Sequence, residues 1–147
     1  MWWAYTVYFT VSIQFSHMIM DELYTFVQRK SKKYYVWTSI GVTTTGKKFY
    51  FYHLSKRKTV KELFNFNLDL PKVDRVYSDE NFSYHNIYGD KVIQEKSGIT
   101  NIIENLNSQL RDKISYLVRR TKAHSKSSLW LDYRLAIFFI SKNIGLY

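Results

Sequence analysis

The sequence contains no cysteine, a single proline and only five glycines among its 147 residues. The absence of cysteine excludes a disulfide scaffold, a thiol nucleophile and any zinc site with a cysteine ligand. It also favours the cytoplasm as the compartment, because disulfides are rare there. Because proline and glycine are so scarce, the chain has little from which to build long loops or linkers. The 46% apolar and 23% charged content is that of a globular protein and excludes a disordered or collagen-like chain.

Acidic residues are also scarce, since 12 Asp and Glu stand against 22 Lys and Arg, a net charge of +10. The basic excess is concentrated in two stretches. Residues 47–61 hold six basic side chains and no acid, and residues 111–126 hold six basic side chains and one acid. Basic clusters in a chain with 18% aromatic residues are typical of a protein that binds nucleic acid. An ordinary solvated face is the alternative interpretation.

Residues 1–20 contain no Asp, Glu, Lys or Arg, which raises the question of a membrane anchor or signal peptide. A signal peptide is disfavoured because the segment has no basic start and no small-residue cleavage site. A spanning helix is disfavoured because it would contain six polar side chains. The apolar residues instead follow the two-residue period of a strand: Trp3, Tyr5, Val7, Phe9, Val11, Ile13 and Phe15. We expect no membrane association, a strand-like extension over residues 1–17, and one domain over residues 18–147.

The order of elements in that domain predicts an α/β fold with a mixed five-stranded sheet and flanking helices. Strands are predicted at 18–28, 34–43, 48–54, 75–78 and 91–94, and helices at 61–66, 100–121 and 128–143. The basic run 29–33 is interpreted as a turn, 44–47 as a hairpin turn, and 81–88 as a loop or short helix. Thr59 and Glu62 form a capping-box pattern at the start of the first helix. The long helix has an apolar stripe about 80° wide, made by Ile99, Ile103, Leu106, Leu110, Ile114 and Leu117.

Three of the few acids lie where a metal-dependent phosphodiester reaction needs them. Asp21 lies inside an apolar strand, where a carboxylate costs free energy unless it is paired or binds a metal. Asp79 follows the fourth strand directly, at the end where α/β sites tend to lie. Glu104 lies on the long helix with 24 residues between it and Asp79. Mg²⁺ prefers such carboxylate oxygens, and two ions can activate the attacking oxygen and stabilise the leaving one. The alternative for Glu104 is an ordinary boundary residue, and Glu22, opposite Asp21 on the strand, is interpreted as structural.

Several short motifs occur in a recognisable order between Met18 and Ser128. They are Asp21-Glu22-Leu23-Tyr24, then Tyr77-Ser78-Asp79 with Tyr84 five residues on, then Glu104-Asn105 with Leu110-Arg111, then Arg119-Arg120-Thr121 and Ser125-Lys126-Ser127. Each motif alone is weak, but the ordered set resembles the catalytic part of insertion sequence 1 family transposases. These are DDE enzymes with a ribonuclease-H-like fold.

The resemblance implies a role for individual residues. Asp21, Asp79 and Glu104 would be the catalytic residues and the ligands of Mg²⁺ or Mn²⁺, with two ions expected. Arg111 would face the DNA backbone two turns after the glutamate, and the basic stretch predicts further DNA contacts from Arg119, Arg120, Lys122 and Lys126. Asn81-Phe82 stand where the family usually has a tryptophan. The family's N-terminal zinc-binding and helix-turn-helix region has no counterpart in this cysteine-free sequence.

The sequence therefore predicts the catalytic domain of a DNA transposase, which cleaves a strand and transfers it. DNA is the expected substrate, and a partner chain or fusion is expected to supply recognition of the element ends. A homo-oligomer is expected for the active form. A non-enzymatic, basic DNA-binding remnant of a transposase is the alternative, and a membrane-peripheral protein led by residues 1–20 ranks below both.

Overall fold

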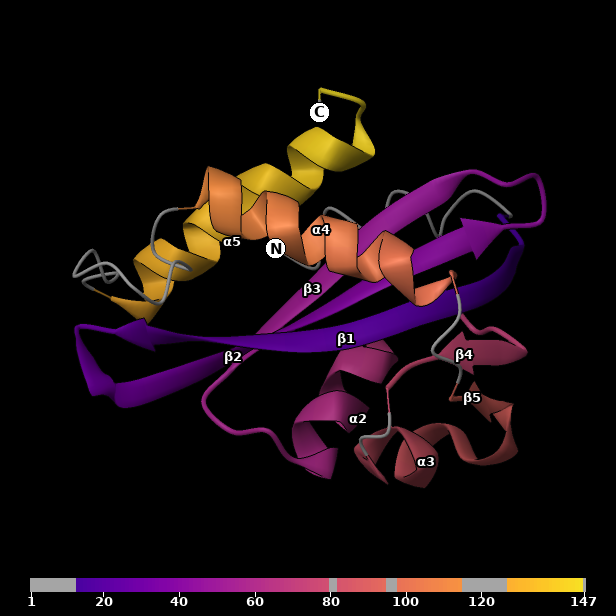
Figure 1. Ribbon diagram of the computed structural model, residues 1–147, viewed down its shortest axis with the longest axis horizontal. Helices are drawn as coiled ribbons and strands as arrows, with labels where there is room; N and C mark the ends of the chain where they lie inside the picture. Colours follow the sequence, from indigo (N-terminus) through magenta and orange to yellow (C-terminus); the bar gives the residue numbers. More distant parts are fainter. Residues whose placement is uncertain (1–12, 80–81, 95–97, 115–126, 147) are drawn as a thin grey trace.

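The protein is described by a computed structural model, which covers residues 13–79, 82–94, 98–114 and 127–146. It has one five-stranded sheet of order β3-β2-β1-β4-β5. Helices α4 (Thr100–Lys113) and α5 (Ser128–Asn143) cover one face, and α2 (Val60–Leu68) and α3 (Phe82–Tyr88) lie on the other (Figure 1). The prediction of an α/β, ribonuclease-H-like fold with a mixed five-stranded sheet is confirmed.

Three long antiparallel strands form the larger part of the sheet: β1 (Phe15–Val27), β2 (Arg29–Thr43) and β3 (Lys48–Ser55). The chain reverses between β1 and β2 at Gln28, which has a φ of 65°. The predicted turn at 29–33 is therefore wrong, because these residues already belong to β2. The hairpin predicted at 44–47 is confirmed, with Gly46 at a φ of 89°. Only glycine adopts that backbone conformation without strain.

The first strand begins earlier than the sequence predicted. Phe15 packs against the rings of Phe49 and Phe51, with centroids 5.8 and 6.4 Å away. A Cβ at Gly41 would lie 2.8 Å from the Phe15 ring, so the glycine makes room for it. Residues 15–17, assigned to the N-terminal extension, therefore belong to the sheet, because this aromatic contact holds them there. Residues 1–12 lie outside the described part of the chain.

The outer edge of β3 is covered by α5. The Asn143 side chain accepts a hydrogen bond from the Tyr50 N–H at 2.7 Å and donates one to the Tyr50 carbonyl at 2.8 Å. The hydroxyl of Tyr52 donates to Asp132 at 2.7 Å. The contacts of Asn143 satisfy the backbone N–H and C=O of Tyr50 on this edge strand, which makes the edge a poorer template for pairing with another chain. The helix itself has the predicted bounds, and Ser127 caps its N-terminus.

The smaller strands β4 (Arg75–Tyr77) and β5 (Val92–Ile93) run parallel to β1. A 3-10 turn, η1 (Gly89–Lys91), connects α3 to β5. The long helix was predicted to extend to residue 121, but α4 ends at Lys113 because Ile114 is extended, with φ −116° and ψ 98°. A β-branched residue tolerates that conformation well, and the apolar stripe alone does not reveal where the helix stops. Residues 115–126 lie outside the described residues.

Candidate active site

Asp21 lies in the middle of β1 and is partly buried. Its Oδ1 accepts the backbone N–H of Glu22 at 2.8 Å, and its Oδ2 accepts the Asn107 amide at 2.7 Å. Burial raises the pKa of the Asp21 carboxyl from 3.8 to about 6; the Glu22 N–H opposes the rise, while the charges of Glu22 and Asp79 add to it. A carboxyl in this environment favours a proton or a bound cation over standing alone as an anion.

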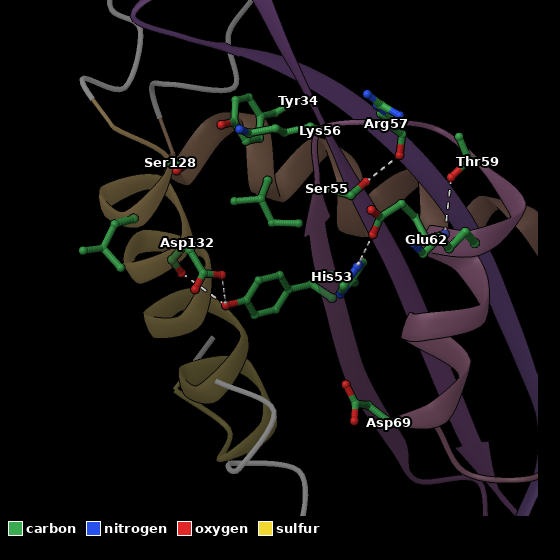
Figure 2. Close-up of a pocket in the computed structure, with 14 residues that line it drawn as sticks. Tyr34, His53, Ser55, Lys56, Arg57, Thr59, Glu62, Asp69, Ser128 and Asp132 are labelled. Atoms are coloured by element: carbon green, nitrogen blue, oxygen red, sulfur yellow. Dashed lines mark hydrogen bonds and ion pairs between the residues drawn. The ribbon is translucent and has the colours of Figure 1, made fainter.

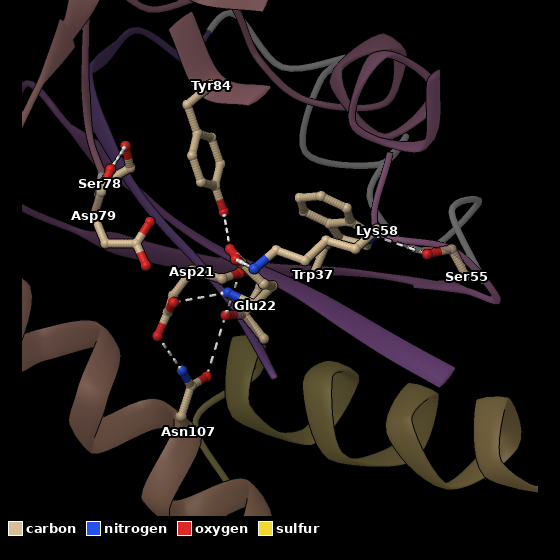
Figure 3. A network of polar contacts seen from close by, with 10 residues as sticks. Asp21, Glu22, Trp37, Ser55, Lys58, Ser78, Asp79, Tyr84 and Asn107 are labelled. Atoms are coloured by element: carbon tan, nitrogen blue, oxygen red, sulfur yellow. Dashed lines mark hydrogen bonds and ion pairs between the residues drawn. The ribbon is translucent and has the colours of Figure 1, made fainter. Parts of the chain in front are cut away.

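Asp79 reaches Asp21 because β4 is short. That strand pairs with His17–Ile19 and ends at Tyr77, two residues before Asp79. Within the described residues, β4 therefore leaves the edge of β1 uncovered from Met20 onward, and side chains from both faces of β1 can meet around that edge. One carboxylate oxygen each from Asp21, Glu22 and Asp79 lie within 4.8 Å of one another (Figure 3). We call these three residues the carboxylate cluster.

Glu22 approaches the cluster from the opposite face of the sheet. Its side chain is only 5% exposed and forms an ion pair with Lys58. The hydroxyl of Tyr84, a fully buried residue of α3, donates to Glu22 Oε2 at 2.7 Å. Burial and the Glu22 charge raise the pKa of the Tyr84 hydroxyl well above 10, which keeps it a donor. These contacts agree with the structural role predicted for Glu22, yet its carboxylate also belongs to the cluster.

Lys58 is held in position by a buried polar chain. The Trp37 indole donates to Ser55 Oγ at 2.9 Å, and Ser55 Oγ donates to the Arg57 carbonyl at 2.8 Å. Thr59 then caps α2 by accepting the N–H of Glu62 at 3.4 Å. Burial acts to lower the pKa of Lys58, but the hydrogen bond and charge of Glu22 raise it overall. The loop thus presents a fixed positive charge to the carboxylate cluster.

Asn107 is a site residue that was not predicted from the sequence. It lies on α4, is 3% exposed, and donates to Asp21 while its own Oδ1 accepts from the Thr38 hydroxyl at 3.1 Å. Asn107 follows Ile103 by four residues and precedes Leu110 by three, so it falls within the apolar stripe. A polar residue inside such a stripe needs a buried partner, and this was the signal available in the sequence.

Glu104 is not part of the cluster. It is exposed on α4 and lies three residues before Asn107, so the two backbones are about 4.5 Å apart along the helix axis. The structure thus brings together Asp21, Asp79 and the unexpected Glu22, and places Glu104 on the neighbouring turn of the helix that contacts Asp21. Arg111 is partly buried in the last turn of α4. The predicted contacts Arg119, Arg120, Lys122 and Lys126 lie outside the described residues.

A groove lies elsewhere, along β3 between α2 and α5 (Figure 2), and has a volume of about 940 Å³. Three exposed basic residues line it: Lys56, Arg57 and Lys61. Two acids of the groove have partners, because His53 contacts Glu62 at 3.1 Å and Tyr52 binds Asp132. Size alone does not identify a site, and the carboxylate cluster, not this groove, has the donors for phosphodiester chemistry.

The donor set of the cluster fits a divalent cation. It consists of carboxylate oxygens only, the hard ligands that Mg²⁺ and Mn²⁺ prefer, and the exposed Asp79 leaves one side accessible. Burial of Asp21 adds a further reason, because a cation would replace the hydration that this carboxylate has lost.

Comparison with known proteins identifies a family for the chain. A search of the curated proteins found no match. None of the helices in the described part of the chain has the length and apolarity needed to cross a membrane. A family model described as IS1 transposase matches residues 16–144, which is most of the chain and includes the whole carboxylate cluster, Asn107 and Glu104. The protein therefore belongs to the IS1 transposase family.

Proposed function

We propose that the chain is the catalytic domain of a DDE transposase, which cleaves and transfers DNA strands with the help of two divalent ions. The observation that supports it most strongly is the meeting of Asp21 and Asp79 at the end of β4 in a member of this family. One oxygen from each of three carboxylates lies within 4.8 Å of the others, and a bound cation would offset the repulsion between them.

Asp21 and Asp79 would hold the ions, Mg²⁺ or Mn²⁺, and Glu104 would complete the set from α4. When bound, such ions polarise the phosphate and stabilise the charge on the attacking and leaving oxygens. The chain's own residues provide the geometry. Asn107 fixes the orientation of the Asp21 carboxylate and joins α4 to β1. Lys58 offsets part of the negative charge, and Arg111 would bind a DNA phosphate.

The proposed reaction has two in-line displacements at phosphorus. Water attacks a phosphodiester at the element end, and the departing oxygen becomes a free 3′-hydroxyl. That hydroxyl then attacks a phosphodiester of the target DNA, so one bond forms as one breaks. The basic side chains would position both DNA segments through their phosphates, which convey no sequence information. We therefore also propose that a partner chain or fusion recognises the element ends and that the active form is a homo-oligomer.

The test is a nicking and strand-transfer assay with purified protein, DNA and Mg²⁺ or Mn²⁺. We expect activity that disappears with chelator, in Asp79→Asn and in Glu104→Gln, while folding is retained. Asp74→Asn is the matched control, because Asp74 is an exposed aspartate just before β4. If the chain is instead a basic DNA-binding remnant, the parent and all the variants will bind DNA and none of them will cut it. Equal cleavage by Asp79→Asn and the parent would refute the catalytic assignment.

The same assay separates the two glutamates. If Glu104 is the third ligand, Glu104→Gln loses activity with an unchanged free energy of unfolding, because its side chain is exposed. Glu22→Gln is expected to lower stability, because it weakens the ion pair with Lys58 and the bond from Tyr84. Activity that survives Glu104→Gln would instead favour Glu22 as the ligand.

A further inference from the structure

Helix α5 is apolar on two opposite faces. Its inner face is buried against the sheet through Leu131, Leu135, Phe138 and Phe139. Its outer face remains accessible: Trp130, Tyr133 and Ile137, and Ile144 directly after the last helical residue, are 48%, 58%, 48% and 63% exposed. Large apolar side chains that gather on the exposed face of a helix are typical of an interaction surface. The outer face is therefore a surface that lacks a partner within the described part of the chain.

These four exposed residues, together with the partly buried Ile140, have the spacing of a helix-packing seam. Trp130, Tyr133, Ile137, Ile140 and Ile144 follow one another at intervals of three, four, three and four residues; we call these five residues the outer seam. This is the a/d pattern by which two helices interlock. The Trp130 and Tyr133 rings are stacked, with centroids 5.9 Å apart and planes 5° from parallel, and the Arg134 guanidinium lies 5.7 Å from the Trp130 ring. Trp, Tyr and Arg are the residues most enriched at the centre of protein interfaces.

We propose that the outer seam binds the outer seam of a second copy of this chain, as an antiparallel pair of α5 helices. The rings of Trp130 and Tyr133, of roughly 150–250 Å² and about half exposed, contribute about 100 Å² each, and the smaller isoleucines contribute less. Complete burial of the seam therefore covers up to about 500 Å² per chain and about 1,000 Å² in the pair. That total reaches the lower limit of a specific interface. The seam contains no charged residue, so it can meet its own copy without like charges in contact.

The shape of the seam selects the antiparallel arrangement. Its N-terminal part holds the bulky rings of Trp130 and Tyr133, and its C-terminal part holds only isoleucines. An antiparallel pair places rings against isoleucines and keeps the two helices evenly spaced, whereas a parallel pair would crowd rings at one end. The two-fold axis then passes beside Ile137, and each Trp130 faces the partner's Ile144.

The first experiment measures the mass of the protein in solution by sedimentation over a range of concentrations. We expect a concentration-dependent dimer, and a monomer for Ile137→Glu, whose fold is checked by circular dichroism. Leu68→Glu on α2 is the matched control, because Leu68 is a 68% exposed leucine outside the seam, and this variant should remain a dimer. Added salt should not weaken the dimer, since chains of net charge +10 repel each other.

Three outcomes would overturn the proposal. They are a parent protein that is monomeric at every concentration, an Ile137→Glu protein that still dimerises, and a dimer that forms only after residues 1–12 are removed. The last result would mean that the chain's own N-terminal segment covers the seam.

The second experiment uses the absence of cysteine from the chain, which makes single-cysteine crosslinking free of background. Ile137→Cys should form a disulfide with its own copy under a mild oxidant, because the two side chains meet at the axis. Trp130→Cys should not, because antiparallel helices would separate these positions by about 21 Å along the axis. A mixture of Trp130→Cys and Ile144→Cys should crosslink. Self-crosslinking of Trp130→Cys would refute the antiparallel arrangement.

Discussion

Replacement of Asp21 by asparagine is expected to stabilise the metal-free protein above pH 6 while abolishing strand cleavage. The folded-state pKa of Asp21, about 6, is higher than its ordinary value of 3.8. The favourable contribution of such a group to the free energy of unfolding is complete below about pH 4 and is lost as the pH rises through 6. A shift of about two pKa units corresponds to a loss of about 3 kcal/mol, as an upper value for a partly buried group.

Asparagine avoids this loss because it does not ionise. Its carbonyl can still accept the Asn107 amide, but its own NH₂ would then face the backbone N–H of Glu22, which removes one hydrogen bond. That loss costs about 1 kcal/mol. The net gain for Asp21→Asn above pH 6 should therefore be about 1–2 kcal/mol, and below pH 4 the variant should be no more stable than the parent.

The assay is urea unfolding of parent and variant between pH 4 and pH 8 in the presence of a chelator. Other titrating groups are common to both proteins, so the difference between the two curves reports mainly Asp21 and its coupling to the cluster. Asp74→Asn, which replaces an exposed aspartate outside the carboxylate cluster, is the control for the substitution itself. A flat difference for Asp21→Asn, or one that falls as the pH rises, would refute the reasoning. Adding Mg²⁺ should then stabilise the parent more than the variant, because ligand binding favours the folded state.

Three further changes test other parts of the structure. Tyr84→Phe removes the buried donor to Glu22 and should lower the free energy of unfolding by about 1.5–3 kcal/mol in urea titrations. An unchanged free energy of unfolding would mean that Glu22 is held in place without the Tyr84 hydroxyl. Gly41→Ala should lower the free energy of unfolding by about 1–3 kcal/mol in the same titrations, because the new Cβ would meet the Phe15 ring at 2.8 Å. An unchanged free energy of unfolding would show that the ring moves freely. Arg111→Ala should reduce the slope of log affinity against log salt for duplex DNA by about one with no change in sequence preference, and an unchanged slope would remove this residue from the DNA contacts.

Much of the fold could be predicted from the sequence because its signals are local. The Gly46 turn and the Ser128 start of α5 each depend on neighbouring residues, and each appears in the structure as predicted. The errors are at boundaries. The end of the long helix at Lys113 and the entry of Phe15 into the sheet depend on contacts with distant residues, which periodicity does not record.

For the candidate site, the sequence alone determined that Asp21 and Asp79 are unusual, because each acid interrupts or ends an apolar strand. Only the tertiary structure decided which groups accompany them. Glu22 joins the cluster because the short β4 leaves the edge of β1 open, and Asn107 reaches Asp21 because α4 packs across β1 and β2. Both contacts join segments whose relative position follows from strand pairing and helix packing over many residues. A linear pattern records which face of its own element a side chain occupies, whereas the partner across that face is set by the whole fold.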